Sequence, residues 1–221
     1  MRGVVVWDWN GTLLDDTKEA VEALNLMLRR RSLKCITLEF YKERFRFPAR
    51  DFYEEIGIKV ADDEWDELAK EYHSSYAMIP SSLAEGTLEA LEAVSRAGFH
   101  QVIASASRSD LLKAQVSSFG IAEYFSEIRG TDNLDGAGKK DVVQGVVERW
   151  KGAALDENCN FVMIGDSLHD WEVSVSLGVS CVLCATGGHS ERRLKEVSKP
   201  ALTLREAASR AISILKKSVE L

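Results

Sequence analysis

The chain has 221 residues, 45% of them hydrophobic and 29% charged, so it is long enough for one core, or for one core with a small appended domain. Its net charge of −7 and pI near 5.3 argue against a nucleic-acid partner, because a nucleic-acid-binding surface needs a basic face. No segment predicts a membrane span, and the N-terminus lacks the basic and long apolar regions of an export signal, so we expect a cytoplasmic protein without a membrane partner.

The first predicted element is a strand in the apolar run that starts at Val4. A β-branched run of this kind suits a strand that is buried on both faces, and the pair Asn10-Gly11 predicts a sharp turn after it. Asp8 then lies at the carboxyl end of the strand, the edge at which open α/β sheets bind ligands. An Asp that merely caps a turn is the alternative, but polar residues further along the chain favour a functional site.

A helical pattern follows from residue 16 to about residue 80. Asp16 and Glu19 have the spacing of a capping box, so we expect a helix to begin there. The predicted helices of this region are Thr17–Arg31, Thr37–Arg44, Arg50–Ile56 and Asp63–Tyr76. We interpret residues 16–80 as a small helical domain inserted into a core that consists of residues 1–15 and 81–221.

Helices and strands alternate from Leu83 onward, which is typical of a parallel sheet with helices on both faces. The predicted strands are His100–Ala104, Glu127–Arg129, Phe161–Ile164 and Ser180–Cys184. The predicted helices are Glu85–Ala97, Asp110–Phe119, Lys140–Trp150, one ending at Leu177, Ser190–Val197 and a last amphipathic helix from about Leu204. The fold class is therefore α/β, with a central parallel sheet.

Several polar residues follow the predicted strands. They are Asp8, Ser105, a lysine at 139 or 140, and the pair Asp166 and Asp170. In this order they resemble the four motifs of the haloacid dehalogenase-like (HAD) superfamily, and the resemblance covers essentially the whole chain. Within the superfamily the chain is similar to the phosphoglycolate phosphatase-like hydrolases. This implies a Rossmann-like core with an inserted α-helical cap, and activity on a small phosphoglycolate-like phosphomonoester.

The resemblance implies a role for each acid. Asp8 would be the nucleophile, because a carboxylate can attack phosphorus and form an aspartyl-phosphate, which divides one displacement into two easier ones. Clustered acids repel one another and an incoming phosphate, so a divalent cation is expected, and oxygen ligands favour Mg²⁺. The implied metal ligands are Asp8, the main-chain carbonyl of Asn10, Asp166 and Asp170.

The other implied contacts are to the phosphate group. Ser105 would hydrogen-bond a phosphate oxygen, with an ordinary turn serine as the alternative. Lys139 would place its charge on the phosphate and the nucleophile, and its position at the turn before a helix favours it over Lys140. Backbone N–H groups around Gly11 and Thr12 would bind phosphate oxygens.

Asn10 departs from the family pattern, in which an Asp two residues after the nucleophile acts as general acid and base. An amide cannot exchange a proton in this way, although it can donate a hydrogen bond. A general acid contributes about 10²–10⁴-fold to a rate. Three alternatives stay open: a leaving group that needs no protonation, a slow phosphatase or a phosphate-ligand binding or regulatory protein, and deamidation of Asn10 to Asp. The dehalogenase branch of the superfamily also lacks this Asp, but it needs no metal. Because the pair Asp166 and Asp170 favours a metal, we rank that branch third.

The predicted cap is rich in arginines and aromatic residues between residues 40 and 53. Arg46 and Arg50 flank Pro48 and are candidates for holding the far end of the substrate, with solvated arginines as the alternative. Arg108 would meet the phosphate or flank a helix start. Trp9 would shield the nucleophile or pack under the cap.

Other reactive side chains receive no site role. Cys181 and Cys184 have CxxC spacing but lie in a predicted strand, where they point to opposite faces, so core thiols are favoured over a zinc site. His169 is expected to face outward or pack. The expected partner is a small phosphorylated metabolite, and both a monomer and a homodimer stay open.

Overall fold

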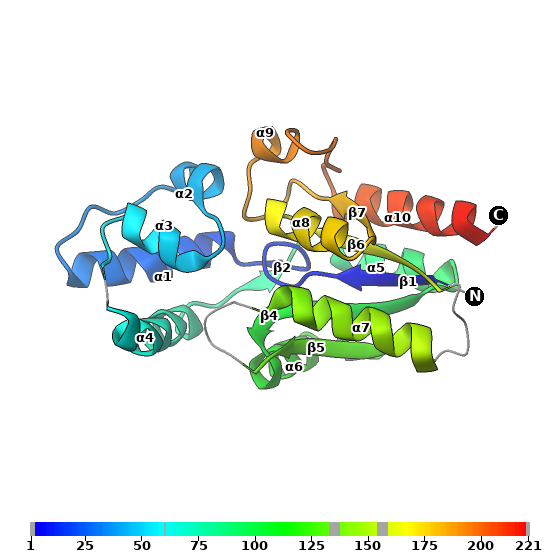
Figure 1. Ribbon diagram of the computed structural model, residues 1–221, viewed down its shortest axis with the longest axis horizontal. Coiled ribbons are helices and arrows are strands. Elements are labelled where there is room, and N and C mark those ends of the chain that lie inside the picture. The colour runs from blue at the N-terminus through cyan, green and yellow to red at the C-terminus, as the bar shows by residue number, and fades with distance from the viewer. Residues whose placement is uncertain (1–2, 60, 133–137, 154–158, 220–221) are drawn as a thin grey trace.

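The structure is a computed structural model that describes residues 3–59, 61–132, 138–153 and 159–219. Figure 1 shows a helical part beside a larger part that is built on a sheet. The strands of this sheet are β1 (Gly3–Trp7), β4 (His100–Arg108), β5 (Glu127–Thr131), β6 (Asn160–Gly165) and β7 (Ser180–Leu183). They are parallel and lie in the order β5-β4-β1-β6-β7. The central position of β1 accounts for its uninterrupted apolar sequence.

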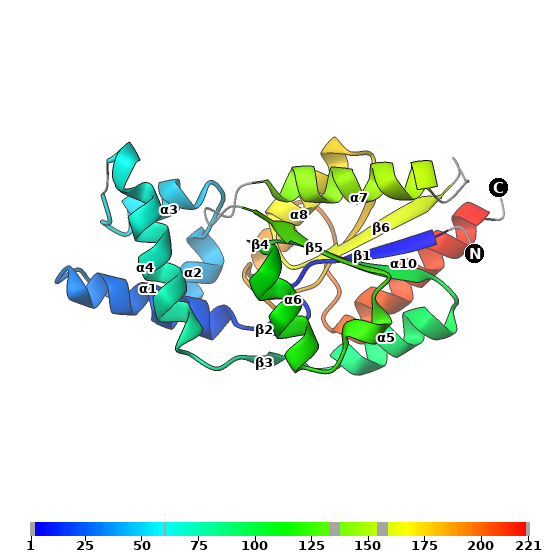
Figure 2. The ribbon, with the colours of Figure 1, turned by 90° about the horizontal axis from the view of Figure 1, so that it is seen from below.

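Alternate side chains of β1 enter different halves of the core, and all of them from Val4 to Trp7 are fully buried. Val5 and Trp7 pack with α5 (Thr87–Arg96), α6 (Ser109–Ser118) and α10 (Leu204–Val219). Val4 and Val6 pack with α7 (Lys139–Ala153) and α8 (Leu168–Ser176). Figure 2 shows the two groups of helices on opposite sides of the sheet. The predicted α/β class with a parallel sheet is confirmed.

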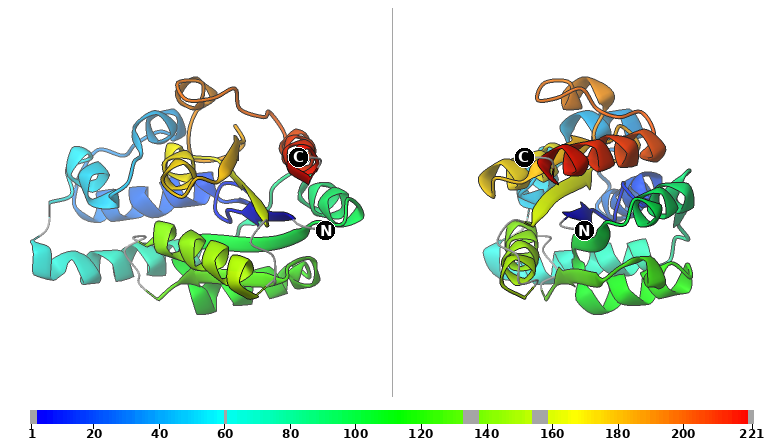
Figure 3. Two further views of the ribbon diagram at one scale, coloured as in Figure 1. Left: turned by 45° about the vertical axis from the view of Figure 1, so that its right-hand side comes forward. Right: turned by 90° about the vertical axis from the view of Figure 1, so that its right-hand side faces the viewer.

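The helical part contains α1 (Thr17–Arg30), α2 (Leu38–Arg44), α3 (Ala49–Glu55), the short η1 (Asp62–Glu64) and α4 (Trp65–Ala77). The four α-helices agree with the predicted ones to within two residues at each end. They enclose an apolar cluster of their own, which includes Leu24, Phe52 and Leu68. We call this part the cap and the part with the sheet the core. Figure 3 shows the start of β1 and the end of α10 at the side of the core away from the cap.

Two short strands that the sequence pattern did not predict join the cap to the core. β2 (Leu14–Asp15) precedes α1, β3 (Ser82–Leu83) follows α4, and the two pair in antiparallel fashion, Leu14 with Leu83 and Asp15 with Ser82. A strand of two residues has no detectable periodicity, which explains why it was missed. Both connections of the cap therefore run side by side.

A second contact between cap and core lies near α9 (Glu191–Leu194), where the predicted helix over Ser190–Val197 proves shorter. The Arg193 guanidinium donates to the main-chain oxygens of Lys42 and Phe45 at 3.1 and 2.8 Å. The core also contains the short η2 (Ala122–Tyr124). Within the described ranges, no helix combines the length and the apolar character that a bilayer span requires.

Candidate active site

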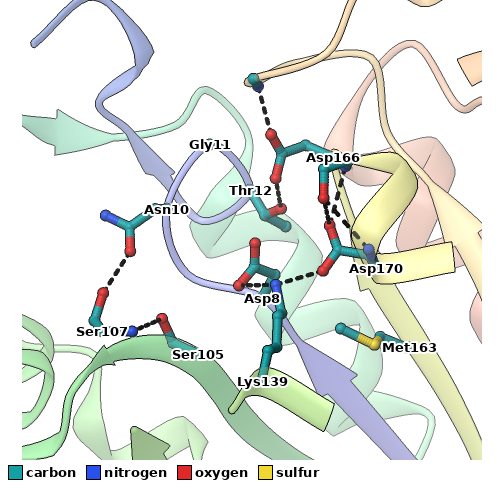
Figure 4. A network of polar contacts seen from close by, with 12 residues as sticks. Asp8, Asn10, Gly11, Thr12, Ser105, Ser107, Lys139, Met163, Asp166 and Asp170 are labelled. Atoms are coloured by element: carbon teal, nitrogen blue, oxygen red, sulfur yellow. Dashed lines mark hydrogen bonds and ion pairs between the residues drawn. The ribbon is translucent and has the colours of Figure 1, made fainter. Parts of the chain in front are cut away.

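The carboxyl ends of β1, β4 and β6 lie next to one another because these strands are neighbours in the sheet. Asp8 directly follows β1, and its N–H donates to the Ile164 carbonyl at 2.9 Å. Asp166 directly follows β6, and Ser105 lies in β4. Figure 4 shows these side chains around one point at the sheet edge. The edge predicted from the sequence therefore gathers the polar residues.

Lys139 is the first residue of α7 and lies among the acids, with 5% of its surface exposed. Its Nζ is 2.7 Å from Asp8 Oδ1 and forms a second ion pair with Asp170 Oδ1 (Figure 4). Burial opposes the lysine charge, but Asp170 and Asp8 outweigh it and hold the Lys139 pKa above its usual value. The neighbouring Lys140 is exposed. The structure thus brings Lys139, and not Lys140, to the site.

Asp8, Asp166 and Asp170 form a buried cluster in which one oxygen of each lies within 4.8 Å of the others. Burial raises the pKa of Asp8 well above its usual value, and burial together with Asp170 raises that of Asp166 to about 6. Burial acts in the same sense on Asp170, but Lys139 outweighs it and lowers the Asp170 pKa. When all three carboxyls are ionised, they outnumber the single Lys139 ammonium and leave the cluster with a net negative charge. A divalent cation fits this charge and this all-oxygen donor set.

Hydrogen bonds from backbone and side-chain donors hold Asp166 and Asp170 in place. Thr12 Oγ1 donates to Asp166 Oδ1 at 2.9 Å, and the Gly188 N–H donates to Asp166 Oδ2. Asp170 Oδ2 accepts from the N–H and the hydroxyl of Ser167 at 3.0 and 2.6 Å, the arrangement of a capping box at the start of α8. Both carboxylates are therefore oriented before any ligand arrives.

Close backbone approach explains a glycine beside this cluster. A Cβ on Gly187 would lie 2.1 Å from the main-chain oxygen of Gly11 and 2.3 Å from Asp166 Oδ2. Gly11 itself has φ +73°, a left-handed conformation that favours glycine. The turn after β1 therefore packs directly on the acid cluster.

The N–H groups expected to face phosphate are engaged within the chain. The Gly11 N–H donates to Asp16 Oδ1 at 2.7 Å, and the Thr12 N–H donates to the Trp9 carbonyl at 3.2 Å. Their contact with phosphate stays a prediction. Ser105 is almost fully buried and its Oγ accepts from the Ser107 N–H at 3.0 Å. It lies within β4 and not after it, because that strand continues to Arg108 through a register shift.

Both ends of the Asn10 side chain are hydrogen-bonded. Nδ2 donates to Asp16 Oδ2 at 2.7 Å and lies 3.3 Å from the Tyr76 hydroxyl, while Oδ1 accepts from Ser107 Oγ at 2.6 Å (Figure 4). The Tyr76 hydroxyl in turn donates to Asp16 Oδ2 at 2.6 Å. Asn10 thus connects β4 of the core with α4 of the cap.

The side chain of Asp16 does not have the helix-capping role that the sequence predicted. It precedes α1, but its side chain forms no hydrogen bond with that helix, so the predicted capping box with Glu19 is wrong. The carboxylate turns toward Gly11, Asn10 and Tyr76, which provide three donors to a side chain that is 4% exposed. Burial raises the Asp16 pKa, and these hydrogen bonds offset part of the rise. The need of a buried carboxylate for donors overrides the local helix signal.

A cavity of about 450 Å³ lies between the sheet edge and the cap. From the core it is lined by Asp8, Ser105, Lys139 and Asp166, among other residues. From the cap it is lined by a group of aromatic side chains, which are Tyr41, Phe45, Phe47, Tyr53, Trp65, Tyr72 and Tyr76. The polar residues of the core therefore line one side of the cavity, and aromatic side chains of the cap line the other side.

Neither Arg46 nor Arg50 belongs to the described residues that line this cavity. Arg46 forms an ion pair with Glu55, and the Arg50 guanidinium lies 5.3 Å from the centre of the Trp65 ring. The structure therefore does not bring the two predicted specificity residues to the site. Glu55 pairs with Arg46 and the Trp65 ring contacts Arg50 within the cap, which sequence spacing does not reveal.

Arg108 lines the cavity, but its guanidinium forms a fork with Asp110, at 2.6 and 2.7 Å. Trp9 is fully buried and its Nε1–H donates to Gln115 of α6 at 3.0 Å. The prediction that Trp9 shields the nucleophile or packs under the cap is wrong, because it packs in the core. His169 packs on the Phe47 ring, with centroids 4.7 Å apart, as expected.

The paired cysteines do not form a metal site among the described residues. Cys184 is buried and Cys181 is partly buried. Burial raises the thiol pKa of Cys181 to about 12 and that of Cys184 to about 11, and neither thiol belongs to a cluster of three possible metal ligands among the described residues. The contacts of Tyr76 with Asp16 and of Ser107 with Asn10 have no signal in the sequence, because the partners are 60 and 97 residues apart in the chain.

Comparison with known proteins identifies the family. The family model described as haloacid dehalogenase-like hydrolase matches residues 5–184. The "Probable phosphatase IndB" of Dickeya dadantii is 22% identical over 99% of this chain and 97% of its own length. A phosphoglycolate phosphatase of Mesorhizobium japonicum is 24% identical over 91% of this chain and 90% of its own length.

Solved structures share the fold at low sequence identity. A predicted phosphatase from Clostridium acetobutylicum has a TM-score of 0.74 and 20% identity, and the alignment covers 100% of both chains. The Mycobacterium tuberculosis Protein Tyrosine Kinase A also has a TM-score of 0.74, with 21% identity and coverage of 94% of this chain and 97% of that one. These likenesses describe the fold and not the reaction. The match of the family model over most of the chain places the protein in the haloacid dehalogenase-like hydrolase family.

Proposed function

We propose that the protein is a Mg²⁺-dependent phosphatase that hydrolyses a small organic phosphomonoester through an aspartyl-phosphate on Asp8. The observation that carries the proposal is the position of Asp8. It lies at the edge of the sheet, in an ion pair with Lys139 and beside two further buried acids, and it faces a cavity large enough for a metabolite. The phosphatases among the relatives support the same class of reaction.

Each residue of the site would have a separate role in the reaction. Asp8 attacks phosphorus, Lys139 offsets charge on the phosphate oxygens, and the Ser105 hydroxyl donates to one of those oxygens. Asp8, Asp166, Asp170 and the main-chain carbonyl of Asn10 would hold Mg²⁺. When bound, the cation neutralises the negative charge that gathers where the carboxylates meet the phosphate.

Asn10 supports a second candidate function, a phosphate-ligand binding or regulatory protein with little turnover. Its amide occupies the place of the usual general acid and base and is itself held by Asp16 and Ser107. Loss of a general acid and base reduces a rate by about 10²–10⁴-fold. Such a protein would bind phosphate ligands with the same residues and release product slowly.

The deciding experiment is a panel of phosphomonoesters assayed with Mg²⁺ and with EDTA on wild type, Asp8→Asn and Asn10→Asp. Mg²⁺-dependent phosphate release by wild type that Asp8→Asn abolishes is the expected result. An inert wild type that binds phosphate ligands, together with turnover gained by Asn10→Asp, would establish the binding protein instead. Metal-independent release of chloride from a haloacid would point to the dehalogenase branch.

A further inference from the structure

We infer that the site accepts aryl phosphates, in which the phosphate is carried by the oxygen of an aromatic ring. The inference rests on the proposed phosphatase function and adds the chemical class of the leaving group. It draws on two separate observations, the lining of the cap side of the cavity and the surroundings of Asn10.

The cap side of the cavity suits an apolar ring. Seven aromatic side chains contribute to its described lining, and no lysine or arginine of the cap does. Tyr72 lies centrally in this group, with its ring 6.5 Å from that of Tyr53 and 6.0 Å from that of Tyr76. Aromatic rings associate at such centroid distances, so an aryl group can take a place among them.

The same lining disfavours a leaving group that carries a carboxylate, such as glycolate. Among the described acidic and basic side chains of the lining, residues 16–80 contribute the Asp16 carboxylate, which would repel a second carboxylate, and the His73 imidazole. The core contributes Lys139, which is paired with Asp8 and Asp170, and Arg108, whose guanidinium is already in a fork with Asp110. A carboxylate would therefore meet described lysine and arginine side chains of the lining that are already paired with acids.

Asn10 sets a second condition on the leaving group. Its amide has no proton to transfer, and the nearest carboxylate, Asp16, accepts hydrogen bonds from Gly11, Asn10 and Tyr76. Of the described residues in this hydrogen-bonded group, neither Asn10 nor Asp16 is thus arranged to protonate an alkoxide. A phenol has a pKa of about 10, against about 16 for a water-like hydroxyl, so an aryl oxide can depart as the anion.

The reaction would proceed in two steps, and neither step needs a proton from an acid of the protein. First, a carboxylate oxygen of Asp8 bonds to phosphorus and the phosphorus–aryl oxygen bond breaks, with its electron pair staying on the aryl oxide. Next, a water oxygen bonds to phosphorus and the bond to Asp8 breaks, which restores the carboxylate. The proton lost by the water passes to solvent. An acyl phosphate also departs without a proton, but its carboxylate product meets the same lining without cap cations.

The first test compares kcat/KM with Mg²⁺ for phenyl phosphate, phosphoglycolate and glycerol phosphate. Wild type is expected to prefer phenyl phosphate by at least about 100-fold, and Asn10→Asp is expected to reduce this preference by at least about 10-fold because kcat/KM rises for the two alkyl esters. Equal or better use of phosphoglycolate by wild type overturns the inference but leaves the phosphatase intact. Failure of both proteins on every ester overturns the phosphatase itself.

The second test separates binding of the ring from the intrinsic ease with which an aryl oxide leaves. Tyr72→Leu is expected to raise KM for phenyl phosphate by about 5- to 10-fold and to leave KM for glycerol phosphate within twofold. Phe40→Leu changes a cap aromatic that is 38% exposed and does not line the cavity, so it is the matched control. An unchanged KM for phenyl phosphate in a folded Tyr72→Leu protein overturns the inference.

Discussion

The two halves of the cavity differ in what holds their side chains. In the core half, Asp8, Lys139 and Asp170 are linked by ion pairs at the ends of strands and helices. In the cap half, aromatic rings pack against one another and contribute little charge. We infer from this difference that the core half determines the reaction and the cap half selects the group that leaves. The predictions below separate the two contributions.

The largest effect is expected at Asp8. Replacing Asp8 with Asn removes the attacking oxygen but keeps the size of the side chain, so phosphatase activity should fall by at least about 10³-fold. Rapid acid quench with a labelled ester should also find no phosphoprotein. A variant that still forms a phosphoprotein would assign the nucleophile to another residue. It would also contradict the inference that Asp8 in the core half of the cavity determines the reaction.

A large loss of stability is expected for Lys139→Met in metal-free protein. The change leaves Asp8 and Asp170 buried without their counter-charge, and breaking a buried pair in this way typically costs about 3–5 kcal/mol. Urea unfolding with EDTA measures the cost. Lys140→Met is the matched control, because Lys140 is exposed and a surface change of this kind usually stays within about 0.5 kcal/mol. Equal stability of the two variants would contradict the role of the buried pair.

A smaller effect is expected where the halves meet, at Tyr76. Tyr76→Phe removes the donor to Asp16, and a hydrogen bond to a charged group is worth about 1.5–3 kcal/mol. The free energy of unfolding should fall by an amount in this range. Tyr72→Phe loses a hydroxyl from the same helix without a described hydrogen bond to another residue, so its stability should change less. A reversed order would show that the contact between Tyr76 and Asp16 does not stabilise the closed arrangement.

The smallest effect is expected at Arg46. Its side chain is paired with Glu55 and lies outside the described cavity lining, so Arg46→Ala should change KM within about twofold for every ester. A KM increase of about 10-fold confined to esters of carboxylic acids would show that the cap rearranges to present this arginine. That result would mean that the cap, through Arg46, binds the carboxylate of the substrate.

The same contrast governs what the sequence could predict. Asp8 and Asp166 could be placed at one sheet edge because each follows a strand whose pattern is visible locally, and Lys139 was added through the resemblance to the family motifs; the structure brings the three together. The environments of Asp16 and Arg46 were misjudged because they depend on Tyr76 and Glu55, whose positions follow from packing within the cap. Local periodicity reports which face of an element is buried, and it does not report which partner a charged side chain finds there.

The antiparallel pair β2 and β3 has a consequence for how such a chain can be taken apart and rebuilt. Asp15 faces Ser82 across this pair, so the two ends of the inserted segment leave the core as neighbours. A two-residue turn such as Asn-Gly can connect antiparallel strands at this spacing. The cap can therefore be exchanged for a different insert, or replaced by a hairpin turn, without changing the order of any strand in the central sheet.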